Sequence, residues 1–283
     1  MNSTDILYAT AIGKFKKWYK FLYSDECNEE ALELFEKAKN QYIGKKEYDK
    51  SILCYEWIIT CLTELKSYDK MATIYVEYAD ILLNKKNNSE LALKYYSKAI
   101  NILIDEGKFI NIAKIKTKLA QYYTDKLCLE EAITLYKEIV EIYQDSPSSL
   151  CPLKETTIKM FELQVHCGKF EDAYNSVKNL LENKKILEHT YLYNDNIFHA
   201  LLCMIIVDNN NLENALEDFS KMSFDKSSQY LFLIKLNRFL QNNDLEGFTA
   251  VIQEYDSLTK LGELEIILLK KIKELFENEN SIL

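Results

Sequence analysis

One pattern of small and apolar residues recurs along the chain about every forty residues. Each repeat has a small residue, an aromatic residue four positions later, an apolar residue three positions beyond that, and a further position three residues before the small one. These positions share one face of an α-helix, because side chains three or four residues apart are neighbours on a helix. The small residues are Ser51, Ala92, Ala132, Ala173 and Ala215, followed by Tyr55, Tyr96, Tyr136, Val177 and Phe219.

The repeated face predicts helices that pack closely against their neighbours. A small residue allows another helix to approach, and the ring fills the space one turn later. A second amphipathic helix is expected between repeats, as in residues 70–83 and 110–123. Gly-Lys stands between expected helices at three places, Gly44, Gly107 and Gly168, and we expect each glycine to close the preceding helix as its C′ residue. The unit is therefore an antiparallel helix pair of the tetratricopeptide (TPR) kind, although its period exceeds the usual ~34 residues.

The pattern weakens after Ala215. Helices are still expected at residues 227–240, 244–255 and 263–277, but they are not clear repeats. We predict an all-α fold of about fourteen helices, in which TPR-like antiparallel helix pairs form a right-handed superhelical sheet that is followed by a C-terminal helical bundle.

The predicted domains are the helical sheet at residues 1–185 and the bundle at residues 186–283. The strongest break in the pattern is residues 145–152, which have Ser-Pro-Ser-Ser at their centre. We expect the last helix to end near Phe276 or Glu277, because the residues that follow are polar and poor helix formers.

Composition narrows the class of protein. The chain has only two prolines and six glycines, and 48% of its residues are hydrophobic, which favours long packed helices over disorder. No run of about 18 apolar residues could span a bilayer, and the first residues do not resemble a signal peptide. Seven cysteines without a C-x-x-C pair indicate reduced, mostly buried thiols in a cytosolic protein. A net charge of −9 argues against nucleic-acid binding.

The chain lacks the motifs of common catalytic sites. No two glycines are spaced for a phosphate loop, no H-E-x-x-H is present, and no serine is flanked by glycines. His199 and Cys203 are one helical turn apart and His166 precedes Cys167, yet without zinc-ligand spacing we interpret them as core or interface residues. We therefore expect no enzyme activity, no catalytic residues, no metal site and no cofactor.

Several segments resemble the soluble NSF attachment protein (SNAP) family, in its α/β branch with the Sec17-like proteins. They are the C-terminal residues 254–257, 260–261 and 268–273, together with 107–109, 130–133 and 198–203, in the same order and spacing over residues 28–276. The resemblance implies an adaptor that binds assembled SNARE complexes, and that recruits and stimulates the NSF/Sec18-type AAA+ ATPase hexamer which disassembles them in vesicle fusion and intracellular transport. It also implies a cytoplasmic protein with weak peripheral membrane contact.

The resemblance assigns candidate binding residues. The SNARE-binding candidates are Tyr42, Lys46, Lys108, Lys114, Lys159 and Tyr191. Any one of these lysines could instead be a solvated helix surface. Glu155 stands where the family pattern has a lysine, although Lys154 and Lys159 are close by.

The family's hydrophobic membrane loop aligns with residues 18–26. Its candidates for membrane contact are Trp18, Tyr19, Leu22 and Tyr23. Trp and Tyr suit the bilayer interface, whereas the alternative interpretation is that these residues form the buried end of the first helix.

Contact with the ATPase is assigned to acidic residues and the C-terminus. The candidates are Asp208, Glu277, Glu279 and Leu283. The alternative for the last residues is an inert tail. For the whole chain, the rival hypothesis is a generic TPR-like helical-repeat scaffold that binds another protein; binding to assembled SNARE bundles separates the two.

Overall fold

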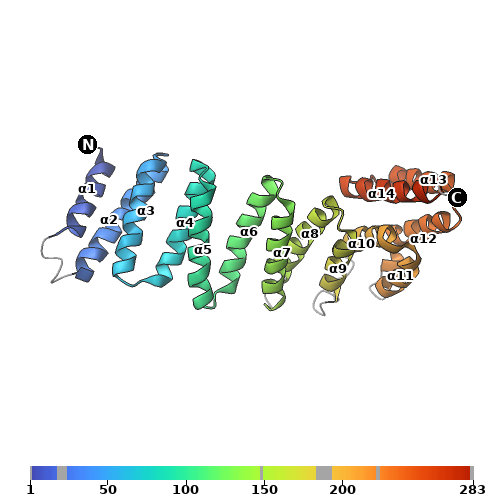
Figure 1. Ribbon diagram of the computed structural model, residues 1–283, viewed down its shortest axis with the longest axis horizontal. Helices are drawn as coiled ribbons and strands as arrows, with labels where there is room; N and C mark the ends of the chain where they lie inside the picture. Colours follow the sequence, from blue (N-terminus) through green and yellow to red (C-terminus); the bar gives the residue numbers. More distant parts are fainter. Residues whose placement is uncertain (1, 18–23, 147–148, 183–192, 221–223, 281–283) are drawn as a thin grey trace. The chain divides into compact units, whose positions relative to one another are not determined.

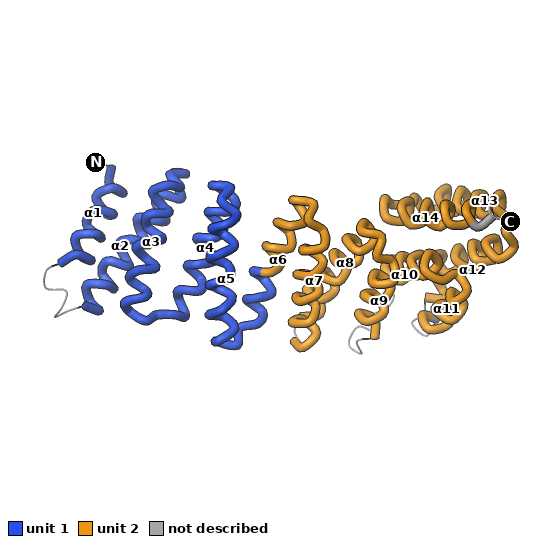
Figure 2. The backbone as a smooth tube through the Cα atoms, in the orientation of Figure 1, with its two compact units in different colours: residues 1–115 blue, residues 116–283 orange. Residues whose placement is uncertain are grey.

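The computed structural model describes residues 2–17, 24–146, 149–182, 193–220 and 224–280, and these residues form α-helices and short 3₁₀ turns without any strand (Figure 1). Fourteen α-helices lie in this described part of the chain, which confirms the all-α, TPR-like prediction. The described residues form two compact units, 1–115 and 116–283 (Figure 2).

The first unit contains α1 (Ser3–Phe15), α2 (Ser24–Gly44), α3 (Tyr48–Glu64), α4 (Tyr68–Lys86), α5 (Ser89–Asp105) and the start of α6 (Phe109–Asp125). The second unit contains the rest of α6, α7 (Leu129–Gln144), α8 (Leu150–His166), α9 (Phe170–Leu181), α10 (Asn194–Asp208), η2 (Asn209–Asn211), α11 (Leu212–Ser220), η3 (Phe224–Lys226), α12 (Ser228–Gln241), α13 (Leu245–Leu258) and α14 (Glu263–Asn280).

The sequence repeat coincides with the odd-numbered helices from α3 to α11. The first residues of α3, α5, α7, α9 and α11 are Tyr48, Ser89, Leu129, Phe170 and Leu212, each three positions before the small residue of its repeat. The small residues of the first four repeats are fully buried, Ala215 is 5% exposed, and the residues four positions later are at most 2% exposed. The predicted packing face is therefore confirmed.

A recurrent turn sets the length of the repeat. Among the described residues, six with a left-handed backbone follow helices at intervals of about 20 residues, or twice that: Lys46, Lys66, Asn87, Gly107, Leu127 and Gly168. A seventh, Asn243, follows α12 outside this spacing. At Gly107 the amide N–H donates to the carbonyl of Ile104 (3.0 Å), and the next N–H donates to Leu103 (2.9 Å), as in a Schellman motif. Gly168 closes α8 in the same way.

The C′ prediction is confirmed at Gly107 and Gly168, where φ is 68° and 72°, but it is wrong at Gly44. Gly44 is the last residue of α2, and the left-handed position falls two residues later, at Lys46. The chain therefore adopts the turn at a lysine, although a glycine would adopt it at lower cost.

In the first unit, each helix packs on the next in sequence, from α1 to α5. The core is rich in aromatic rings: Tyr55 stacks on Tyr78 with centroids 5.2 Å apart, and Phe35 stacks on Trp57 at 5.7 Å. Such pairs stabilise a helix layer beyond the area that they bury.

In the second unit, the packing changes at α10. Helices α7 to α10 pack in sequence, whereas α10 also contacts α11, α12 and α14. A helix with neighbours on several sides is the centre of a bundle, so the predicted C-terminal bundle is confirmed. The domain boundary at residue 185 and the right-handed twist stay predictions.

The last helix is longer than predicted. It continues through Asn280 instead of ending near Phe276. Phe276 is 5% exposed and anchors the helix, and Lys273 pairs with Glu277 one turn later, with Nζ and Oε1 3.7 Å apart. These contacts, together with the good helix propensity of Glu277 and Glu279, outweigh the weaker propensity of Asn278 and Asn280, which costs about 0.5 kcal/mol each.

Candidate interaction surface

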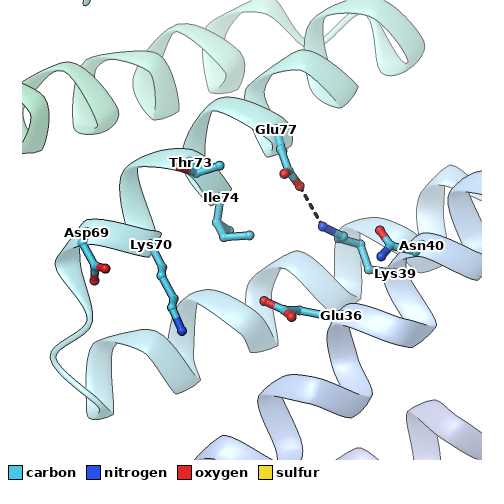
Figure 3. A pocket seen from close by; sticks show the side chains of 8 residues that line it. All are labelled: Glu36, Lys39, Asn40, Asp69, Lys70, Thr73, Ile74 and Glu77. Carbon is cyan, nitrogen blue, oxygen red and sulfur yellow. Dashed lines mark hydrogen bonds and ion pairs between the residues drawn. The ribbon is translucent and has the colours of Figure 1, made fainter. Parts of the chain in front are cut away.

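A polar cleft of about 380 Å³ opens between α2 and α4 in the first unit (Figure 3). Lys39 from α2 and Glu77 from α4 meet across it, with Nζ and Oε2 2.7 Å apart. The other lining residues are Glu36, Asn40, Asp69, Lys70, Thr73 and Ile74. The two helices bring these groups together because α3 crosses behind them and packs on both.

The ammonium group of Lys39 has two partners, the Glu77 carboxylate and the ring of Tyr55, and these two also contact each other. Lys39 is only 6% exposed, and its Nζ lies 5.2 Å from the ring centre of Tyr55. The Tyr55 hydroxyl in turn donates a hydrogen bond to Glu77 at 3.3 Å. Burial and the Glu77 carboxylate raise the pKa of Tyr55, so its hydroxyl stays protonated and remains a donor. This network connects α2, α3 and α4, while Glu36, Asp69 and Lys70 add further polar groups to the lining of the cleft.

The cleft is not strongly basic. Three carboxylates and two lysines line it, which gives a formal charge of −1. Its groups can form hydrogen bonds and ion pairs with the polar surface of another protein, but among its lining residues no nucleophile lies next to a base. This arrangement of polar groups is suited to binding another protein, not to catalysis.

The predicted lysines of the first unit lie at different places. Consecutive helices run antiparallel, so Lys46, after α2, and Lys108, after α5, are at opposite ends of the helices (Figure 1). Lys108 pairs with Glu106, with Nζ and Oε2 3.0 Å apart, and remains 49% exposed. Lys114 is exposed on α6, about 9 Å further along the helix axis at 1.5 Å per residue. Lys108 and Lys114 thus lie just before and in the first half of α6, whereas Lys46 lies at the opposite end of the helices.

Tyr42 lies inside the first unit. It is 2% exposed, and its hydroxyl donates to Asp5 of α1 at 2.8 Å. Lys50 also lies over its ring, 5.3 Å from the centre. A partner could touch this ring only if α1 moved away, so we assign Tyr42 to the attachment of α1 and leave it out of the candidate surface.

In the second unit, Lys159 is exposed on α8, and Glu155 lies one turn before it, also exposed. Lys154 is half-buried, and its Nζ lies 4.3 Å above the ring of Tyr193. The basic character of this helix face therefore rests mainly on Lys159.

At the C-terminal end, Asp208 has a local structural role. Its carboxylate accepts hydrogen bonds from the backbone N–H of Asn210 (3.1 Å) and the side chain of Asn211 (2.6 Å), which begins η2. Glu277 is exposed on α14. The side chain of Glu279 lies outside the described residues, as do Trp18, Tyr19, Leu22, Tyr23, Tyr191 and Leu283.

His199 connects two helices of the bundle. Its Nε2 lies 2.6 Å from Glu265 Oε1 of α14, and this contact holds the pKa of Glu265 below its ordinary value. Burial raises the pKa of the Cys203 thiol, one turn from His199. Cys203 is fully buried, and His199 is half-buried where α10 meets α14, which agrees with the prediction of core or interface residues for this pair. In the described part of the chain, no group of three or more His, Cys, Asp or Glu could hold a metal ion.

Two features were not predicted from the sequence: the buried lysine of the cleft and an apolar groove between α13 and α14. A signal for the first was present, because Lys39 falls between Phe35 and Tyr42 on the apolar face of α2. The sequence contains no comparable signal for the groove. Ile266 and Leu269 share one face of α14 with Lys273, and the helix pattern does not show that this face is left partly open by α13.

No helix within the described residues is long and apolar enough to cross a membrane. Stacked antiparallel helix pairs with a polar cleft between two of the helices define a helical-repeat protein of the kind that binds other proteins.

Comparison with known proteins gives the family. The family model "Soluble NSF attachment protein, SNAP" matches residues 4–277, and the chain belongs to this family. It is 26% identical to the beta-soluble NSF attachment protein of Bos taurus over 89% of this chain and 85% of that relative. It is 24% identical to the human alpha-soluble NSF attachment protein, with the same coverage. It is 26% identical to the vesicular-fusion protein SEC17 of Komagataella phaffii, over 87% of this chain and 84% of that protein.

Proposed function

We propose that this chain is a non-enzymatic adaptor that binds assembled SNARE complexes and recruits and stimulates an NSF-type AAA+ ATPase, which disassembles them during vesicle fusion and intracellular transport. The observation that carries the proposal is the family match over residues 4–277, with relatives that are named for NSF attachment and vesicular fusion. The described helix pairs and bundle extend over the same residues.

The surface chemistry is compatible with this role. Lys46, Lys108, Lys114 and Lys159 are exposed, so each could meet an acidic partner surface. Long-range attraction between exposed charges is screened by salt, and it steers association more than it determines affinity. The same proposal places the protein at the cytosolic face of membranes, with weak contact through residues 18–23.

A binding experiment with defined partners tests the proposal. An affinity-tagged chain is mixed with an assembled SNARE four-helix bundle, with the separate SNARE proteins, and with the bundle plus the ATPase. We expect retention of the bundle, little retention of the separate proteins, and recruitment of the ATPase only when the bundle is present. A chain that retains neither bundle nor ATPase would be the generic helical-repeat scaffold instead.

A further inference from the structure

An apolar groove of about 200 Å³ lies between α13 and α14 in the second unit. Phe248 and Leu269, which are 0% and 5% exposed, form its floor. Ile252 of α13 and Ile266 of α14 form its walls, and Ile266 is 39% exposed. Leu261, in the connection between the helices, closes one end.

The groove is open because its two helices pack mainly on other elements. Helix α13 packs on α12, and α14 packs on α10. The connection between them is fixed: the carboxylate of Asp256 accepts a hydrogen bond from the N–H of Leu261 (2.9 Å) and pairs with Lys260 (3.1 Å). The groove is thus built into the bundle, because neither helix can turn toward the other without losing its own packing.

The rim of the groove is positively charged. Lys270 and Lys273 line it, and none of its lining residues is acidic. Lys270 is exposed, and no described carboxylate lies within 4.0 Å of its Nζ. Lys273 pairs with Glu277, with Nζ and Oε1 3.7 Å apart, and Glu277 is not one of the residues that line the groove. An apolar floor below two ammonium groups is complementary to an aliphatic or aromatic side chain that is flanked by carboxylates.

We propose that this groove docks an acidic amphipathic segment of a partner protein, which inserts one aliphatic or aromatic side chain between α13 and α14 and places carboxylates against Lys270 and Lys273. Its volume is below the ~300 Å³ at which small-molecule pockets begin, so a single side chain fits it better than a whole ligand. Residues 266, 269, 270 and 273 follow the helical spacing with which one helix meets another in helix-in-groove recognition.

The site is independent of the proposed function, since its test uses the isolated full chain. The probe is a fluorescein-labelled, glutamate-rich amphipathic peptide with leucines on one face, and its binding is measured by fluorescence anisotropy at low salt. Two matched peptides carry glutamine in place of glutamate, or alanine in place of leucine. We expect the acidic leucine peptide to bind at least about tenfold more tightly than either.

Point variants locate the site. Ile266→Asp adds a charge to the groove wall and Lys270→Glu reverses its rim; both positions are exposed, so the helices should remain folded by circular dichroism. Each should weaken peptide binding by about tenfold or more. The matched controls are Leu258→Asp, at an apolar residue 81% exposed at the end of α13, and Lys226→Glu, at an exposed lysine of η3. The controls should bind as the native chain does.

The proposal is overturned if the acidic peptide does not bind, if the glutamine peptide binds equally well, or if the groove variants and controls behave alike. It is also overturned if sedimentation shows that the native chain dimerises and Ile266→Asp abolishes the dimer, because the occupant is then a second copy of this chain.

Discussion

At the scale of single residues, the regular spacing of the helices depends on a turn with one left-handed residue. Lys46, Lys66 and Leu127 adopt the same left-handed backbone as Gly107 and Gly168. This conformation costs a residue with a side chain about 1 kcal/mol, since Cβ approaches the carbonyl oxygen. The repeated Schellman bonds and the packing of both adjoining helices offset that cost, which explains why these turns do not need glycine.

Replacing Gly168 by alanine should therefore reduce stability in a predictable way. A Cβ atom at Gly168 would meet nothing within 4 Å, so the loss comes from the left-handed backbone alone and should be about 1 kcal/mol. Urea denaturation followed by circular dichroism measures it.

Gly13 provides the matched control for this substitution. It also has open space around it, but it lies within α1 with an ordinary helical backbone. Gly13→Ala should stabilise the chain by about 0.5 kcal/mol, because alanine has the higher helix propensity. A loss of stability in both variants would contradict the backbone explanation.

The contact between His199 and Glu265 makes stability depend on pH. The pKa of Glu265 lies below its ordinary value of 4.5, mainly because of the hydrogen bond with His199. A carboxyl group with a lowered folded-state pKa contributes stability above pH 4.5, and the contribution is lost as pH falls through the folded-state pKa.

Glu265→Gln should thus destabilise the chain by up to roughly 1.5–3 kcal/mol near neutral pH, the range for a hydrogen bond to a charged group. The difference between native chain and variant should shrink toward acid pH, where the native carboxyl is also neutral. Urea unfolding at a series of pH values checks this, and a difference that is constant with pH would show that Glu265 acts without its charge.

At the scale of helices, the repeat predicts both where the odd-numbered helices begin and which residues they bury. Ala132→Leu in α7 should destabilise the chain by about 1–3 kcal/mol, because Ala132 is 0% exposed and extra methyl groups force neighbouring helices apart. Lys137→Leu, at an exposed position of the same helix, should change stability by less than about 0.5 kcal/mol. Thermal unfolding of the two variants gives the comparison.

The sequence was less informative wherever the outcome depended on neighbours that are distant in the chain. The buried Lys39 needs Glu77, 38 residues later, and Tyr42 is covered by α1 through Asp5, 37 residues earlier. A single helix pattern contains neither partner, and the family resemblance, from which Tyr42 became a binding candidate, does not show that α1 covers it. The length of α14 has the same origin. Helix propensity predicts an end near Phe276, but Phe276 is buried against its neighbours and the helix continues to Asn280.

At the scale of the whole molecule, the charges of the first unit should matter for partner binding. Lys108 and Lys114 are both exposed near the start of α6, so Lys108→Glu with Lys114→Glu reverses two charges in one region. The double variant should bind the SNARE bundle at least about tenfold more weakly at low salt, and the difference should narrow as salt rises.

A control for this effect reverses charges elsewhere in the same unit. Lys37 is exposed on α2 and pairs only with Glu33 of its own helix turn among the described residues, with Nζ and Oε1 2.5 Å apart. Lys37→Glu should leave bundle binding nearly unchanged. If the double variant binds the bundle at low salt as well as the native chain, Lys108 and Lys114 do not belong to the interface.

The C-terminus carries the last prediction. Because α14 runs through Asn280 and is anchored by Phe276, the final three residues directly follow a packed helix. If Leu283 contacts the ATPase as the family resemblance implies, Leu283→Ala should lower ATP turnover at saturating adaptor several-fold. SNARE binding should stay intact, because it depends on other residues of this chain. Leu258→Ala, at an exposed leucine of α13, is the control and should stimulate the ATPase as the native chain does. Equal stimulation by all three proteins would assign the tail no part in turnover.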